Sequence, residues 1–207
     1  MTFDYYQKNC RLCKSLCNSQ GKLGKLRLEN TQLFGTKNFV VLPALGPLMP
    51  GHVLVISRKH FLSLASMGIE AISEYFDISE TLSNKFLTND FIEIEHGSIE
   101  TECAGASVIH AHVHWIPGLG NFYTMLEGCL KPLQKVATLT DLVGSNLPYI
   151  YLRGGEKPPR FYEAYSLEMQ FMRRRICELL GRGDWNWRKY PHPDWVQKTI
   201  FLWQKAK

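Results

Sequence analysis

The chain of 207 residues has no apolar run that approaches the ~20 residues needed to cross a bilayer. Its first six residues, MTFDYY, contain neither a basic region nor an apolar stretch, so we expect no secretory signal. Because six cysteines occur without such a signal, we expect a reducing compartment and no disulfide framework. These absences predict a cytoplasmic protein with no membrane partner.

A strong charge of one sign is also missing, although the balance is uneven along the chain. Residues 1–150 hold 12 Lys and Arg against 13 Asp and Glu, a net −1, whereas residues 151–207 hold 12 against 6, a net +6. Such an excess can attract a phosphate, but it is weaker than the basic stripe of a dedicated DNA-binding domain. We therefore do not expect a nucleic-acid partner.

Hydrophobic residues at 45% and charged residues at 21% are globular proportions. The length fits one domain of ordinary size with an appendage. We expect the domain over residues 1–147 and a basic, mostly helical extension packed on it over residues 148–207. Within the domain, strands are predicted at residues 33–42, 52–56 and 91–95, and an amphipathic helix at residues 69–87.

Residues 108–116, VIHAHVHWI, contain three histidines in strict alternation: His110, His112 and His114. The intervening residues are apolar, and this period of two is typical of a half-buried strand whose histidines share one face. Adjacent histidines on such a strand are roughly 6.5–7 Å apart and the outer pair roughly 13 Å, so one metal ion cannot easily bind all three. A catalytic ion held by His110 and His112, or a polar face that merely carries histidine, are alternatives.

A second cluster is the segment Cys10-Arg11-Leu12-Cys13, followed by Cys17. A Cys-x-x-Cys turn can bring two thiolates to one zinc ion, but a closed tetrahedral site needs four ligands. The cysteines could instead be buried apolar side chains or free thiols. An iron–sulfur cluster is a further option, although the spacing matches neither common ferredoxin pattern.

The pattern His110-x-His112-x-His114-Trp115-Ile116 resembles the histidine-triad signature of the HIT superfamily of nucleotide hydrolases and transferases. Upstream, residues 50–60, PGHVLVISRKH, are similar to the strand and Lys-x-His segment of that family. The resemblance covers about residues 5–120. It implies an α+β, HIT-like fold with an antiparallel sheet of about five strands, and it implies a homodimer.

For the chemistry, the resemblance implies a nucleotide-phosphate hydrolase that acts at the α-phosphate and releases a nucleoside monophosphate. His112 would form a covalent nucleotidyl-histidine, and His114 would contact and help protonate the departing oxygen. Ser107 and Gly105 would bind the phosphate oxygens. Dinucleoside polyphosphates and nucleoside phosphoramidates are both candidate substrates.

The zinc-containing members of the family imply a structural site. They join such a cysteine pair to the histidine of the Lys-x-His segment and to the first triad histidine, which here gives Cys10, Cys13, His60 and His110. Cys17 is a possible substitute. The zinc would have no open coordination position, and no organic cofactor is expected.

Two departures from the family pattern leave other functions open. Ala44 stands where relatives usually carry an acidic residue that holds the ribose hydroxyls, and Ala106 stands where many hydrolases have glutamine. A catalytically weak nucleotide-binding module is therefore one alternative, and a nucleotidyltransferase with the same mechanism is another. Glutamine is usual at the position of His114 in the uridylyltransferase branch, which favours hydrolysis here. His96 is a further candidate to line the site.

The extension is predicted to contain a short strand at residues 149–153. A helix capped by Ser166 is expected next, with an apolar stripe of Met169, Met172, Ile176 and Leu179. The basic residues of this region could form a solvated face, or one of them could reach a substrate phosphate, perhaps in a partner subunit. These residues are Arg153, Lys157, Arg160, Arg173, Arg174 and Arg175.

Overall fold

The structure is a computed structural model that describes residues 7–19, 28–100 and 102–205. The expected absence of a secretory signal rests on residues 1–6, which lie outside the described residues. No helix in the described ranges is long and apolar enough to span a bilayer.

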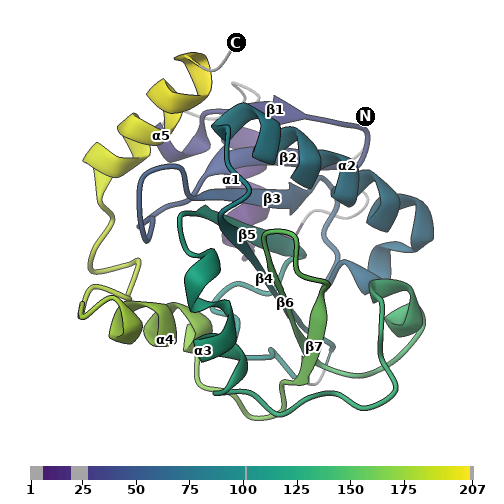
Figure 1. Cartoon of the computed structure of the whole chain (residues 1–207). Helices are drawn as coiled ribbons and strands as arrows, with labels where there is room; N and C mark the ends of the chain where they lie inside the picture. Colours follow the sequence, from purple (N-terminus) through teal and green to yellow (C-terminus); the bar gives the residue numbers. More distant parts are fainter. Residues whose placement is uncertain (1–6, 20–27, 101, 206–207) are drawn as a thin grey trace.

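An antiparallel sheet of seven strands in the order β1-β2-β3-β5-β4-β6-β7 forms the centre of the molecule (Figure 1). The strands are β1 Phe34–Gly35, β2 Phe39–Pro43, β3 Val53–Ser57, β4 Phe91–Gly97, β5 His112–Pro117, β6 Tyr149–Gly154 and β7 Arg160–Glu163. The predicted α+β class is confirmed. The sheet is larger than the five strands expected, because β6 and β7 extend it beyond β4.

Helices cover both faces of this sheet. They are α1 Arg11–Ser19, α2 Ile69–Phe86, α3 Tyr123–Glu127, α4 Phe171–Leu179 and α5 Pro193–Lys205. The long helix α2 packs its buried stripe on one face, because its apolar residues recur every three or four positions. On the opposite face α1 packs against β2 and β3, while α3 and α4 pack against β4 and β6. The middle of that face lies between the two groups of helices.

The alternation of β5 divides its side chains between the two faces. Val113 and Trp115 are buried in the core beneath α2, whereas His112 and His114 point to the opposite face. The predicted strand is shorter than expected, since residues 107–110 form bends and β5 begins at His112. Ile109 was expected to face the core, but it is 43% exposed. The bends place His110 against α1 and separate it from the other two histidines.

The chain beyond residue 147 enters the sheet directly, because β6 pairs with β4 over six residue positions. This segment therefore adds two strands as well as α4 and α5, and its division as a separate domain stays a prediction. The helix expected after Ser166 begins at Phe171, and Met169 is 62% exposed and outside it. The reason is that residues 165–170 form a turn segment that bonds to Gly105 through the backbone N–H of Gln170.

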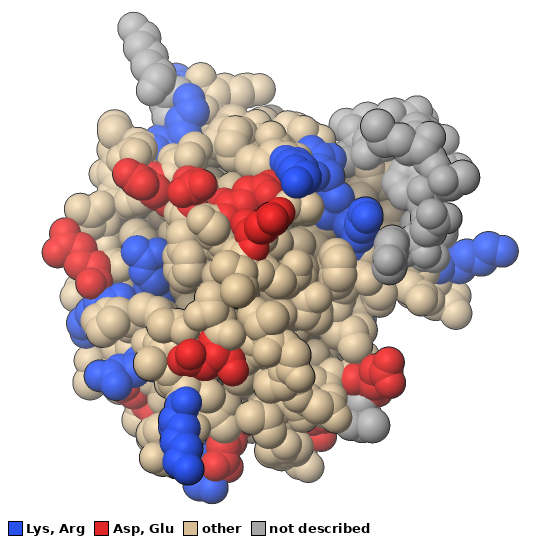
Figure 2. Space-filling model, turned by 90° about the vertical axis from the view of Figure 1, so that its right-hand side faces the viewer, with Lys and Arg blue, Asp and Glu red and all other residues tan. Residues whose placement is uncertain are grey.

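The charged surface in Figure 2 carries acidic and basic side chains that are interspersed on the face shown. They do not gather there into a stripe of one sign. Such a face offers no continuous basic track for the evenly spaced phosphates of a nucleic acid.

Candidate active site and metal cluster

A cleft lies on the middle of the sheet face between α1 and α4, and His112 and His114 form part of its wall. It encloses about 720 Å³ including its open mouth. Apolar residues of β2 and β3 form one side, and the segment before β5 forms another. Three residues of the extension, Gln170, Arg173 and Trp187, complete the lining.

The ring of His112 is held by its own strand. Its Nδ1–H donates to the backbone oxygen of His110 over 2.6 Å, so Nε2 carries the free lone pair. Removal from bulk water lowers the pKa of His112 to about 4, which keeps the ring neutral at pH 7. A neutral imidazole whose other nitrogen is anchored can act as a nucleophile without a separate base.

The ring of His114 is held by His52, a residue that the sequence did not assign to the site. The backbone N–H of Leu48 donates to Nδ1 of His52 over 3.0 Å, so the proton of a neutral His52 lies on Nε2. That Nε2 is 2.9 Å from Nδ1 of His114 and donates to it. Burial lowers the pKa of both rings well below the ordinary value, so both are neutral. The network therefore places the proton of His114 on Nε2, where it is available as a hydrogen-bond donor.

The segment Gly105 to Ser107 reaches the cleft together with His96. Gly105 has a φ of +73°, and a Cβ there would meet the backbone oxygen of Glu168 at 2.9 Å, so a side chain is excluded. The hydroxyl oxygen of Ser107 accepts a 2.9 Å hydrogen bond from Nε1–H of Trp187, which leaves the hydroxyl proton free to donate elsewhere. His96 bonds through Nδ1 to the backbone oxygen of Ala104 over 2.7 Å, and burial lowers its pKa to about 4.

The four residues expected around zinc are brought together. The ligand atoms of Cys10, Cys13, His60 and His110 all lie within 4.8 Å of one another. Nδ1 of His110 is 3.4 Å from Sγ of Cys10 and 3.5 Å from Sγ of Cys13. Tetrahedral zinc with the usual bond lengths separates its S and N ligands by roughly 3.6 Å, so the spacing fits that ion.

The surroundings of the cluster also suit a metal. Nε2–H of His110 donates to the backbone oxygen of Ser57 over 2.8 Å, which orients the lone pair of Nδ1 toward the cysteines. A hydrogen bond from Cys13 lowers the pKa of Cys10 to about 3, which favours its thiolate. Cys17 is not part of this group, and neither is His112. The alternative of a catalytic ion shared by His110 and His112 is therefore not supported by the geometry.

The basic residues of the extension have different surroundings. Arg153 lies 3.5 Å from Glu93, and Arg160 lies 4.0 Å from Glu127. Arg174 and Arg175 form ion pairs with Glu168 and Glu178. Lys157 lies over the ring of Tyr123. Of the six basic residues considered from the sequence, Arg173 is the one that lines the cleft.

Comparisons with known proteins agree with this architecture. Residues 26–121 match the family model of the HIT domain. This part of the chain therefore belongs to the HIT domain family, and the predicted recognition is confirmed. An uncharacterized HIT-like protein of Chlamydia muridarum is 28% identical over 95 residues, which cover 44% of this chain and 73% of that protein.

Solved HIT structures are similar to this chain at low identity. A HIT family hydrolase from Clostridium thermocellum is 15% identical with a TM-score of 0.42, covering 54% of this chain and 92% of its own. A zinc-bound histidine triad family protein from Mycobacterium smegmatis is 20% identical with a TM-score of 0.41, covering 53% of this chain and 74% of its own. The HIT domain supports a general nucleotide-related function, and the HIT-like fold is as predicted.

Proposed function

We propose that the protein is a nucleotide-phosphate hydrolase that acts at the α-phosphate through a nucleotidyl-histidine intermediate. The observation that carries the proposal is the pair of anchored, neutral imidazoles in one cleft. His112 presents a free Nε2 lone pair, and His114 presents an Nε2–H. One ring is thus prepared to attack, and the other to support a departing oxygen.

In the first step Nε2 of His112 forms a bond to the α-phosphorus, and the bond from phosphorus to the leaving oxygen breaks. The electron pair of that bond moves onto the leaving oxygen, which receives a hydrogen bond from Nε2–H of His114. The ring of His112 becomes positively charged. Its Nδ1–H then points at the backbone oxygen of His110, which stabilises that charge.

In the second step water attacks the same phosphorus, and the phosphorus–nitrogen bond breaks. Its electron pair returns to Nε2 of His112, a proton of the water passes to solvent or to the departed group, and a nucleoside monophosphate leaves. The hydroxyl of Ser107 and the backbone N–H groups near Gly105 are proposed to bind the phosphate oxygens in both steps. This position is supported by their place in the cleft and by the bond from Trp187 that orients Ser107.

The Cys10, Cys13, His60 and His110 cluster is proposed to hold a structural zinc ion. When bound, zinc would supply a rigid cross-link with no open coordination position. The residues would then fix α1 beside the segment that precedes β5. Because that helix lines one side of the cleft through Leu12 and Ser15, the cross-link would maintain the shape of the site.

The partners and the location remain part of this proposal. We propose a small nucleotide as the substrate, a homodimer as the assembly and the cytoplasm as the compartment. The nucleoside end would lie against the apolar side of the cleft formed by Leu42, Leu54 and Ile56. Ala44 offers no carboxylate to a ribose, but Glu29 also lines the cleft and brings one to the same end.

The direct test is rapid quenching without acid during turnover, followed by mass spectrometry of the peptide that contains residue 112. We expect a mass increase of one nucleotidyl group on His112, and no adduct in the His112→Asn variant. Turnover by the wild-type protein with no adduct on that peptide would overturn the covalent mechanism. Tight nucleotide binding with no turnover of any substrate would instead favour a binding module.

A further inference from the structure

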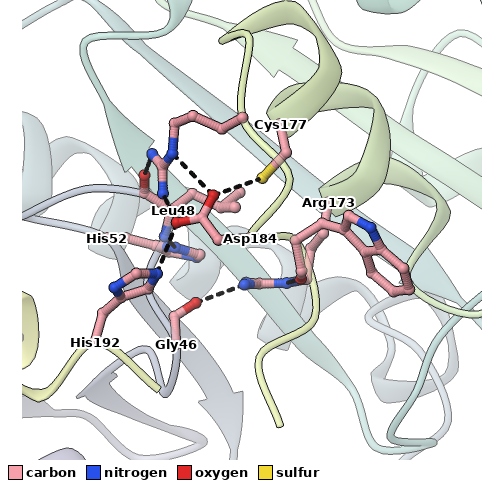
Figure 3. Close-up of polar contacts among 9 residues, drawn as sticks. Gly46, Leu48, His52, Arg173, Cys177, Asp184 and His192 are labelled. Carbon is pink, nitrogen blue, oxygen red and sulfur yellow. Dashed lines mark hydrogen bonds and ion pairs between the residues drawn. The ribbon is translucent and has the colours of Figure 1, made fainter. Parts of the chain in front are cut away.

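Arg173 is a buried cation that has no acidic partner among the described residues. Its side chain is 6% exposed. Its Nε–H donates to the backbone oxygen of Trp185 over 2.9 Å, and one Nη2–H donates to the backbone oxygen of Gly46 over 2.5 Å (Figure 3). These bonds use two of the five N–H donors of a guanidinium group. In residues 7–19, 28–100 and 102–205, no carboxylate lies within ion-pair distance of it.

The nearby acidic residue is already engaged by other groups. Asp184 is paired with Arg182, and it lies 2.8 Å from Nε2 of His192 (Figure 3). Burial lowers the pKa of Arg173 to about 10, so the group remains positively charged at neutral pH. A buried charge is costly unless it is paired, and the pairing group here is not supplied by the described protein.

The position of Arg173 relates it to one end of the reaction. It lines the same cleft as His112 and His114. Its positive charge contributes to the lowered pKa of both His52 and His114, so it lies near that pair of rings. His114 is the residue proposed to contact the leaving oxygen. The charge of Arg173 is therefore on the side where the leaving group departs.

Gln170 adds a second donor at the same end of α4. Its backbone N–H donates to the oxygen of Gly105 over 2.7 Å, and its Oε1 accepts the backbone N–H of Trp187 over 3.3 Å. Its side-chain NH₂ has no partner in the part of the chain that the structure describes, although the residue is only 6% exposed and lines the cleft. Gln170 also has a φ of +63°, which residues other than glycine adopt rarely.

We propose that Arg173 and the side-chain amide of Gln170 form a subsite for a phosphate in the leaving group. The substrates would then be nucleoside diphosphate or polyphosphate derivatives, cleaved at the α-phosphate to expel a phosphate ester or phosphate chain. Nucleoside phosphoramidates, which expel an uncharged amine, would be poor substrates. This inference rests on the proposed function, because it assigns the leaving group of the same reaction.

The extension would thus supply a specificity determinant that lies outside residues 26–121, the part that matches the HIT domain. A guanidinium in a site with little water forms strong charge-assisted hydrogen bonds with phosphate oxygens. It would stabilise the negative charge that appears on the leaving group when the bond to the α-phosphorus breaks.

The test compares two substrates that share the nucleoside and the α-phosphate, for each of the four common ribonucleosides. One is the nucleoside 5′-diphosphate O-methyl ester, which expels methyl phosphate, and the other is the nucleoside 5′-phosphoramidate, which expels ammonia. Values of kcat/KM are measured for the wild type, Arg173→Gln, Arg173→Lys and Gln170→Ala. Arg174→Gln is the matched control, because Arg174 is paired with Glu168 over 2.6 Å and does not line the cleft.

We expect Arg173→Gln to lower kcat/KM for the diphosphate ester by roughly 10- to 100-fold, and by clearly less for the phosphoramidate. Arg173→Lys should retain more of the preference, Gln170→Ala should lose part of it, and Arg174→Gln should match the wild type. Equal losses on both substrates in folded Arg173→Gln and Gln170→Ala would overturn the subsite.

The two levels of the proposal fail in different ways. If the wild type forms the His112 adduct with both substrates and the variants do not change their ratio, the subsite is wrong and the hydrolase remains. If no substrate is turned over and no adduct appears, the hydrolase is wrong and the subsite falls with it.

Discussion

Replacing His52 with leucine removes the group that fixes the proton of His114. In the native protein His52 accepts from the backbone N–H of Leu48 over 3.0 Å and donates to His114 over 2.9 Å. Loss of the second bond leaves His114 free to place its proton on Nδ1, where it cannot reach a leaving oxygen. One such bond contributes about 1–2 kcal/mol, which corresponds to a roughly 5- to 30-fold fall in kcat.

The fall should depend on the leaving group. We expect the full loss with a nucleoside 5′-alkyl phosphate, whose alkoxide is strongly basic and needs a donor. A nucleoside 5′-(p-nitrophenyl) phosphate should be affected less, because the phenolate leaves without assistance. The assay is kcat for both substrates, after checking that each variant is folded.

Two conservative variants separate positioning from stability. His52→Gln places an amide near the position of Nε2 and should recover part of the rate, but not the bond from Leu48. His52→Asn places an acceptor near Nδ1 and should recover stability but not the rate. An unpaired buried N–H costs about 1–3 kcal/mol of unfolding free energy, which thermal or urea unfolding can measure. Equal rate losses on both leaving groups would refute the positioning role.

Three further outcomes are expected from other parts of the structure. Metal analysis should find zinc in the wild type and in Cys17→Ser but not in Cys13→Ser, and equal zinc in all three would refute the ligand set. Trp187→Phe keeps the ring but loses the bond to Ser107, so kcat/KM should fall by roughly 3- to 10-fold, and an unchanged value would exclude that role. Burial raises the pKa of Glu95 from 4.5 to about 7, so its contribution to stability is complete below pH 4.5 and is lost as the pH rises through 7. Denaturant titrations should therefore show a decline of roughly 3 kcal/mol across this range that Glu95→Gln flattens, and an equal decline in the variant would contradict the assignment.

Much of the fold could be predicted from local patterns. The period of two around His112 and the three- and four-residue spacing in α2 are direct consequences of strand and helix geometry. The seven-strand sheet could not be predicted in the same way. Strand β6 follows β5 after more than thirty residues, yet it pairs with β4, and such a pairing leaves no periodic signal in either segment.

The site shows the same limit. The spacing of Cys10, Cys13 and the triad, together with the family resemblance, predicted a cluster that the structure brings together. His52, Gln170 and Trp187 were missed as site residues, because their role depends on contacts between distant segments. A histidine directly after glycine at the start of a strand was the available signal for His52, since the strand is adjacent to β5.

The central claim is that the phosphorus is transferred twice, first to Nε2 of His112 and then to water. The stereochemistry at the α-phosphorus tests it directly. A nucleoside diphosphate derivative with one chiral α-phosphorothioate configuration is hydrolysed in ¹⁸O-labelled water, and the configuration of the product is determined. Two in-line displacements predict overall retention, whereas inversion would show that water attacks directly and would contradict the intermediate on His112.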